Sequence, residues 1–175
     1  MLIFSYGSNM SFQRLAQRVE YLKLVTTGFL KEHQLKFHKK SHDGSGKADA
    51  FFTGGAHDQV WGVVYEIDQR SKTLLDHHEE LGHSYEDRFV DIQTTNEILK
   101  EVQVYCALSA RIEQELQPYH WYKALVVHGA REHGLPNHYV EMLSTIPHWE
   151  DPDIERTENH FKIINHNSSR TNHKK

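Results

Sequence analysis

The alternation of apolar and polar positions predicts several strands in the first two thirds of the chain. An apolar run at residues 2–4 is typical of a short buried strand. The clearest strand places its large apolar side chains on one face, at Trp61, Val63, Tyr65 and Ile67. Shorter stretches predict further strands around residues 22–24, 35–37, 48–52, 89–94 and 102–107. The spacing of the last two across Asn96 predicts a hairpin.

Apolar residues at helical spacing predict four helices, over residues 12–19, 71–82, 118–133 and 137–144. Asp68 and Ser71 are candidate N-terminal caps of the second helix, and Gly134 is the expected stop of the third. Because strands and helices do not alternate regularly, the pattern predicts an α+β fold rather than a series of βαβ units.

The length of 175 residues suits one well-buried core, which we assign to residues 1–147. Beyond Pro147 the composition becomes charged and polar, with one apolar cluster at Phe161, Ile163 and Ile164. Residues 148–175 are therefore predicted to be a polar C-terminal extension, disordered at least in part from about residue 165.

Composition and charge narrow the classes of partner. Hydrophobic residues make up 38% and charged residues 25%, as in a soluble globular protein, and the net charge of −4 gives no reason to expect nucleic acid or anionic membrane as a partner. The single cysteine, Cys106, cannot form an intrachain disulfide and is expected to pack in the core. With no stretch long enough to span a bilayer, we predict a cytoplasmic protein without a membrane partner. The 15 histidines are scattered, which argues against a single metal site.

The turn at residues 7–9 is the first candidate for chemistry, because it lies where a strand passes into a helix. Gly7 permits a close approach to the main chain, and the first amides of a helix have no partner within it. Such a turn suits an anionic group. The alternative is an ordinary turn in which Ser8, Asn9 or Ser11 caps the helix.

Three stretches resemble the γ-glutamylcyclotransferase family in the same order along the chain. They are Tyr6-Gly7-Ser8-Asn9-Met10, Leu75-Asp76-His77-His78-Glu79 and the segment from Gly129 to Pro136. The resemblance implies a small, mixed, partly closed β-barrel surrounded by helices, with a small γ-glutamyl compound bound at its mouth. It implies no metal and no cofactor.

By this resemblance Glu79 is the carboxylate that moves protons. In the implied reaction the α-amine of a γ-glutamyl group attacks its own γ-amide carbonyl, which gives 5-oxoproline and a free amino acid. One glutamate is able to take a proton from the ammonium and return it to the leaving nitrogen. Walls formed by Leu74, Leu75 and Tyr85 would favour such a role by partly burying the carboxyl group. The family glycine that often follows is Glu80 here.

The resemblance also implies the residues that bind the γ-glutamyl group. They are Ile3, Phe4, Ser5, Tyr6, Gly7, Ser8, Asn9, Tyr85, Tyr105 and Tyr122. A phenol is able to hydrogen-bond a carboxylate or an amide while its ring covers the methylene groups. On helical spacing alone, core packing explains Tyr122 equally well.

Several alternatives stay open. Histidines beside acids at residues 77–83 suggest a metal hydrolase, but Gly82 stands where the His-Glu-x-x-His pattern needs its second histidine. A non-catalytic binding module of the same fold is the second alternative. The same chemistry on glutathione or on a γ-glutamylamine is the third. The sequence also leaves a homodimer open.

Overall fold

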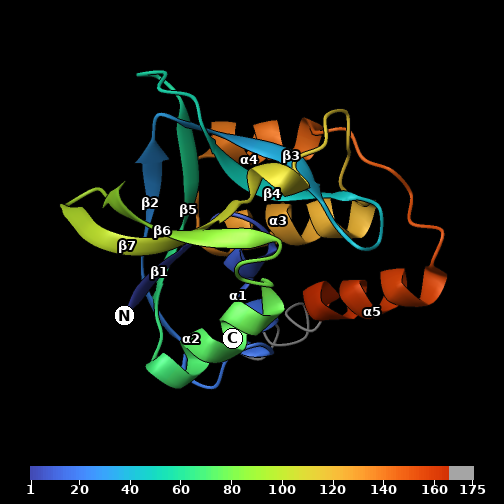
Figure 1. Cartoon of the computed structure of the whole chain (residues 1–175), viewed down its shortest axis with the longest axis horizontal. Helices are drawn as coiled ribbons and strands as arrows, with labels where there is room; N and C mark the ends of the chain where they lie inside the picture. The colour runs from blue at the N-terminus through green and yellow to red at the C-terminus, as the bar shows by residue number, and fades with distance from the viewer. Residues whose placement is uncertain (166–175) are drawn as a thin grey trace, which may run out of the picture.

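Five strands close into a barrel in this computed structural model, which describes residues 1–165 of the chain. Their order around the barrel is β1 (Leu2–Ser5), β5 (Gln59–Glu66), β2 (Lys23–Lys31), β6 (Tyr85–Gln93) and β7 (Ile98–Ala107) (Figure 1). Strand β1 pairs antiparallel with β5 and parallel with β7, which completes the ring. The predicted α+β barrel is confirmed, although the barrel is closed and not partly open.

The strand predicted from Trp61 to Ile67 is buried on both of its faces. Val60, Val63, Val64 and Tyr65 are fully buried, so the strand is covered on both sides. The two stretches predicted around residues 22–24 and 35–37 are longer in the structure. Strand β2 continues through Gly28, and β3 (His33–Lys40) pairs with β4 (Gly46–Phe52) in a separate two-stranded sheet. A Cβ at Gly28 would lie 2.5 Å from the carbonyl oxygen of Gln93, so a side chain there would block the approach of β2 to β6.

The predicted helices are present, with shifted ends. A 3₁₀ helix, η1 (Ser8–Met10), precedes a short α1 (Phe12–Ala16). Helix α2 (Gln69–His78) ends four residues before the expected stop at Gly82, and its predicted cap is confirmed because Asp68 accepts a hydrogen bond from the Ser71 amide at 2.8 Å. The remaining elements are η2 (Ser109–Arg111), α3 (His120–Glu132) and α4 (Asn137–Thr145). Gly134 adopts a φ of +64°, as expected for the stop after α3.

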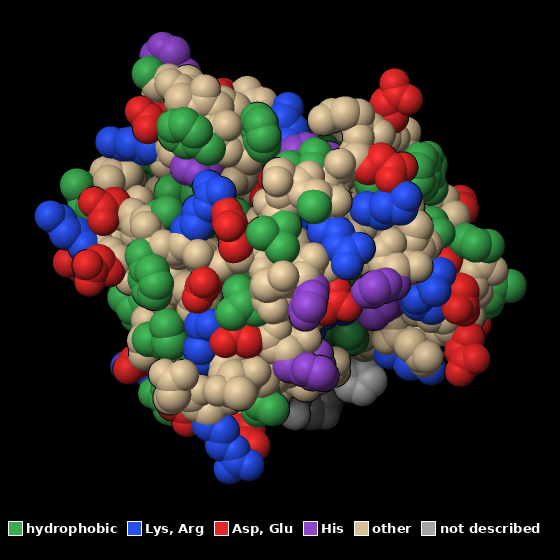
Figure 2. All heavy atoms as spheres, viewed as in Figure 1, with side chains coloured by type: hydrophobic (Ala, Val, Ile, Leu, Met, Phe, Trp, Pro, Cys, Tyr) green, Lys and Arg blue, Asp and Glu red, His purple; other side chains and the backbone are tan. Residues whose placement is uncertain are grey.

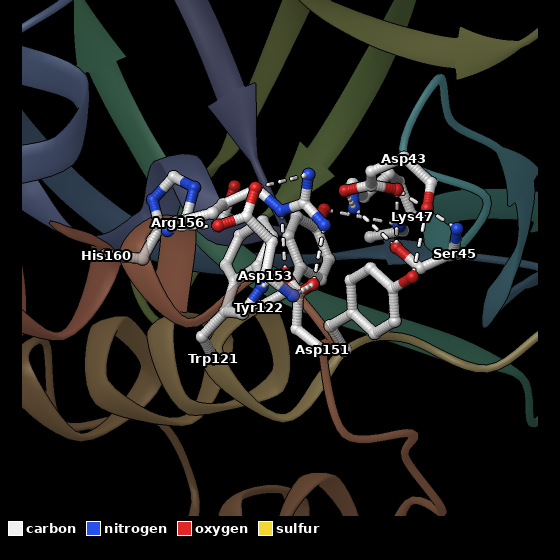
Figure 3. Close-up of polar contacts among 12 residues, drawn as sticks. Asp43, Ser45, Lys47, Trp121, Tyr122, Asp151, Asp153, Arg156 and His160 are labelled. Atoms are coloured by element: carbon white, nitrogen blue, oxygen red, sulfur yellow. Dashed lines mark hydrogen bonds and ion pairs between the residues drawn. The ribbon is translucent and has the colours of Figure 1, made fainter. Parts of the chain in front are cut away.

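A fifth helix, α5 (Ile154–Asn165), was not predicted. It packs against α3, where the Trp121 indole donates to Asp151 at 2.6 Å and the His160 ring stacks on Trp121 at a centroid distance of 3.8 Å (Figure 3). Arg156 also donates to Asp151, through Nε at 2.6 Å. The extension therefore docks on the barrel domain as far as residue 165. The predicted disorder falls on residues 166–175, which lie outside the described residues, and the domain boundary at 147 stays a prediction.

The surface and the core agree with the composition. Figure 2 shows basic, acidic and histidine side chains interspersed on one face, without a broad field of one sign. Cys106 is buried as a free thiol, so the expected core position is confirmed. No helix within residues 1–165 has the length and apolar character needed to cross a membrane.

Candidate active site

A cavity opens where β1 passes into η1, beside the C-terminal end of α2. It contains about 440 Å³ of empty space including its mouth. Its lining consists of Ile3, Phe4, Ser5, Tyr6, Gly7, Ser8, Asn9, Ala48, Leu75, Glu79, Tyr85, Tyr105 and Tyr122. The structure thus brings all eleven predicted site residues together around one space, which we call the first cavity. Ala48 and Leu75 complete its wall.

Close packing explains the glycine in the opening turn. A Cβ on Gly7 would lie 3.0 Å from the Cβ of Ala48 and 3.2 Å from the hydroxyl of Tyr122. The capping interpretation of this turn finds no support, because Ser11 at the start of α1 makes no side-chain cap hydrogen bond. The Ser8 hydroxyl instead accepts a hydrogen bond from Arg14 at 3.0 Å.

Tyrosine hydroxyls fix the opposite wall. Tyr85 donates to the carbonyl oxygen of Ala48 at 3.0 Å, and the Ala48 amide donates to the hydroxyl of Tyr122 at 3.2 Å. Tyr105 donates to Asp76 at 2.7 Å, while Tyr6 donates to the carbonyl of Tyr105. Burial raises the pKa of all four phenols above the usual value near 10, so they stay neutral hydroxyls.

Glu79 caps the C-terminal end of α2 and turns its carboxylate toward the opening turn. Its Oε1 accepts from Arg18 Nη1 at 2.7 Å and from Asn9 Nδ2 at 2.9 Å. Arg18 Nη1 also donates to Asn9 Oδ1 at 3.0 Å, so the three side chains form a closed set. The Glu79 side chain is 15% exposed. A carboxylate in this position is held still, yet it remains open to a ligand in the cavity.

Comparisons with known proteins agree with this architecture. Residues 59–143 match the AIG2-like family. The chain is 28% identical to human γ-glutamylcyclotransferase and 29% identical to the mouse protein of that name, with 83% of this chain and 78% of each relative covered. A solved γ-glutamyl cyclotransferase superposes with a TM-score of 0.82 at 26% identity, over 93% of this chain and 98% of that one. The chain is therefore similar to γ-glutamylcyclotransferases in both sequence and structure.

These comparisons confirm the resemblance predicted from the sequence, and they make the departure at Glu80 informative. Glu80 adopts a φ of +52°, the left-handed conformation that a glycine adopts at little cost after a helix. Its carboxylate accepts hydrogen bonds from Ser84 Oγ and from His42, the latter at 2.8 Å. The hydrogen bond from Ser84 is the main cause that lowers the pKa of Glu80. Two side-chain contacts therefore hold the turn that a glycine would form unaided.

The third family segment supports the opening turn from behind. A Cβ on Gly129 of α3 would lie 2.5 Å from the Ser11 amide nitrogen and 2.7 Å from Met10. The helix therefore packs directly on the main chain after η1. Leu75 lines the first cavity, as expected, but Leu74 does not: it is 37% exposed, so its predicted part in the wall is wrong.

A second cavity adjoins the first and was not predicted. It shares Ser8, Glu79, Tyr85 and Tyr122 with the first cavity, and its other lining residues are Arg14, Arg18, Lys39, Ser41, His42, Lys47, His78 and Glu80. Lys47 donates to Asp43 at 2.7 Å and to Ser45 at 2.6 Å (Figure 3). Burial lowers the pKa of Lys47 to about 8, although Asp43 opposes the shift.

Sequence reasoning missed the cations and Asp76 as site residues. Arg18 lies after the end of α1, and Lys39 and Lys47 lie on different strands, so no local spacing joins them. Asp76 was visible only as part of the Leu-Asp-x-x-Glu pattern. For the metal alternative, residues 1–165 contain no group of three or more His, Cys, Asp or Glu side chains that could hold an ion.

Proposed function

We propose that this chain converts a γ-glutamyl amino acid to 5-oxoproline and a free amino acid, with Glu79 as general base and then general acid. The observation that carries the proposal is the position of the Glu79 carboxylate in the wall of the cavity formed by residues 3–9. The names of the human and mouse relatives support the class of enzyme.

The proposed reaction is balanced without water, metal or cofactor. The α-ammonium of the substrate gives one proton to Glu79, and the free amine attacks the γ-carbonyl carbon to close a five-membered ring. The carbon–nitrogen bond of the γ-amide then breaks, and Glu79 returns its proton to the leaving nitrogen. The ring nitrogen loses its second proton, which the departing amino acid takes up as its ammonium group. Because the nucleophile is part of the substrate, holding it folded supplies up to about 7–11 kcal/mol of the barrier reduction in favourable cases.

The hydrogen bonds of Glu79 suit this double role. Among the described residues all of them use Oε1, which leaves Oε2 available to the ammonium and to the leaving nitrogen. Arg18 and Asn9 fix the orientation of the carboxylate.

The walls of the first cavity suit a γ-glutamyl group. The main chain of residues 3–9 offers amide and carbonyl groups to the α-ammonium and α-carboxylate of the substrate. The neutral hydroxyls of Tyr85, Tyr105 and Tyr122 add polar contacts without a competing charge, and their rings are able to cover the methylene groups. These ten binding assignments belong to the proposal.

The finer parts of the proposal are the leaving group, the location and the assembly. We favour γ-glutamyl amino acids over glutathione and γ-glutamylamines because the segment from Gly129 to Pro136 resembles the enzymes that act on them. A cytoplasmic location fits the single buried Cys106. A homodimer is testable by light scattering.

The test is formation of 5-oxoproline from γ-glutamyl-alanine by the wild-type chain and by Glu79→Gln. Glutamine retains the oxygen that Arg18 and Asn9 bind but is unable to carry the proton. We expect lactam formation by the wild type and a fall in kcat/KM of about 10²-fold or more in the variant.

The matched comparison is Glu80→Gln, one residue along the chain. Its carboxylate accepts hydrogen bonds from Ser84 and His42 outside the first cavity. We therefore expect kcat/KM for γ-glutamyl-alanine to change by less than about tenfold. If Glu80→Gln lost activity and Glu79→Gln retained it, the acid–base role would belong to Glu80. A folded wild type that binds the compound in calorimetry and yields no lactam would instead favour the binding module.

A further inference from the structure

We infer that the second cavity receives the leaving half of the substrate and selects a leaving half with two carboxylates, that is, an acidic amino acid such as glutamate or aspartate. The inference rests on the proposed function. It deepens that function because it assigns a chemical class to the half of the substrate that departs.

The position of Glu79 connects the two cavities. Glu79 lies in the wall of both, together with Ser8, Tyr85 and Tyr122. If the γ-glutamyl group fills the first cavity, the scissile amide lies beside Glu79. The chain attached to the leaving nitrogen then extends into the second cavity, which has about 650 Å³ of empty space including its mouth.

Four cationic side chains line that second space, and two of them are already paired. Arg18 is bound to Glu79 at 2.7 Å, and Lys47 is bound to Asp43 at 2.7 Å. The remaining acid of the lining, Glu80, is bound to Ser84 and His42. Within residues 1–165 neither of the other two cations forms an ion pair with a carboxylate, although the charges of Glu80 and Glu79 act on Lys39.

Arg14 is the first cation without a carboxylate partner among the described residues. It is 7% exposed, its Nε donates to the Ser8 hydroxyl at 3.0 Å and its Nη1 lies 3.2 Å from His160 Nδ1. Burial and the charge of Arg18 both lower the pKa of Arg14. A buried charge without a counter-ion is costly, so the site is prepared for an anion.

Lys39 is the second such cation within residues 1–165. It is 5% exposed, and its Nζ lies 4.8 Å from the centre of the Tyr85 ring. The pairing of β3 with β4 shifts register between Lys36 and Lys39, which turns Lys39 into the cavity while Lys40 stays exposed. Burial lowers the pKa of Lys39, as it does for Arg14.

Two unpaired cations match two negative charges on the leaving half. Any α-amino acid supplies one, its α-carboxylate, and an acidic side chain supplies the second. A leaving amine without a carboxylate would leave both cations uncompensated, and the extra ammonium of a lysine adduct would be repelled by the four cations. The charge balance of the cavity therefore favours an acidic amino acid over a neutral one.

The experiment compares γ-glutamyl-glutamate with γ-glutamyl-glutamine, which have nearly the same shape and differ by one charge. We expect the wild type to show a kcat/KM about tenfold or more higher for the acidic dipeptide, the scale of one charge-assisted hydrogen bond. Lys39→Gln should bring this ratio toward 1, and Lys39→Arg should restore it. Lys40→Gln is the matched control, because Lys40 is bound to Glu113 on the surface, and it should keep the wild-type ratio.

The other outcomes contradict either the charge preference or the proposed function, and they distinguish the two. If the wild type turns over both dipeptides with a ratio near 1, the inference is wrong and the proposed function stands. The same holds for a high ratio that Lys39→Gln leaves unchanged. If neither dipeptide nor γ-glutamyl-alanine yields lactam, the proposed function fails, and calorimetric Kd values for the two dipeptides then decide the charge preference.

Discussion

The two cavities meet at Glu79 and differ in the kind of side chain that lines them. Residues 3–9 and three tyrosines enclose the first, and among the described residues no lysine or arginine lines it. Its polar groups are largely bonded to one another, as in the pair of tyrosine contacts to Ala48. The second cavity is lined by four cations from separate elements, two of them without a carboxylate. The first therefore selects by shape and hydrogen bonding, and the second by charge.

The largest effect is expected where the shape of the first cavity depends on tight backbone packing. A valine at Gly129 would collide with the main chain of Met10 and Ser11 and displace the opening turn. A misplacement of about 1 Å costs about 10²-fold in rate, so Gly129→Val should lower kcat/KM by that order for acidic and neutral dipeptides alike. Steady-state kinetics with both substrates measures this.

Gly134→Ala is the matched control for that variant. Gly134 follows the same helix, has a φ of +64°, and its added Cβ would meet nothing within 4 Å. We expect a stability loss of about 1 kcal/mol from the left-handed conformation with activity retained. Full activity in Gly129→Val would mean that the opening turn tolerates displacement, which contradicts selection by shape.

The second largest effect is expected from weakening the attachment of α5. This helix carries His160, which contacts Arg14 in the wall of the second cavity. Asp151 ties α5 to α3 through Arg156 and the Trp121 indole, and its side chain is fully buried. Asp151→Asn removes a charged acceptor of four hydrogen bonds, so we expect a loss of about 1.5–3 kcal/mol in the free energy of unfolding at pH 7. Urea denaturation measures it.

The pH dependence of that loss follows from the pKa of Asp151. Hydrogen bonding to Arg156 lowers this pKa well below its usual range, so the stabilisation is present above the unfolded-state value near pH 4 and is lost as the pH falls below it. The difference between wild type and Asp151→Asn should therefore shrink between pH 4 and more acidic conditions. Glu150→Gln, at a side chain 79% exposed, should show neither effect. A constant difference down to pH 2.5 would contradict this cause.

The lining of the first cavity was predictable from the sequence, whereas the lining of the second cavity was not. The opening turn and Glu79 lie in two short motifs, so a family resemblance located both. The cations lie far apart along the chain, and the direction of Lys39 depends on the register shift in β3, which alternation does not reveal. Charge selectivity therefore became visible only when burial and partners were known.

The fold divides in a similar way. Strands with clear alternation and helices with clear stops were predicted within a few residues. Closure of the barrel depends on parallel pairing of β1 with β7, between Ile3 and Gln103, a contact that spans most of the domain. Helix α5 was missed because its apolar residues are few and its attachment depends on polar contacts at Asp151.

A smaller effect is expected from one hydrogen bond of the first cavity. Tyr85→Phe removes the donor to the Ala48 carbonyl, which is part of the wall opposite Gly7. The net worth of such a bond is about 0.5–1.5 kcal/mol, so kcat/KM should fall about 2- to 10-fold, equally for acidic and neutral dipeptides. Tyr21→Phe, at an exposed tyrosine, is the control. A fall confined to the acidic dipeptide would mean that Tyr85 acts through Lys39, which lies over its ring.

The smallest effect is expected on the pH dependence of the preference for the acidic dipeptide, which the second cavity should produce. Lys47 has a pKa lowered to about 8 by burial, with Arg14 and Lys39 adding to the shift and Asp43 opposing it. As the pH rises from 7 to 9, Lys47 loses its proton and the cavity loses positive charge. The ratio of kcat/KM for γ-glutamyl-glutamate over γ-glutamyl-glutamine should fall about two- to threefold, since one of four cations is neutralised. Ionisation of the substrate ammonium cancels in this ratio because both dipeptides share it. Lys47→Arg keeps the charge at this position through pH 9, so the ratio should fall less than in the wild type. An equal fall in both proteins would assign the titration to another group, such as Lys39, whose pKa burial also lowers.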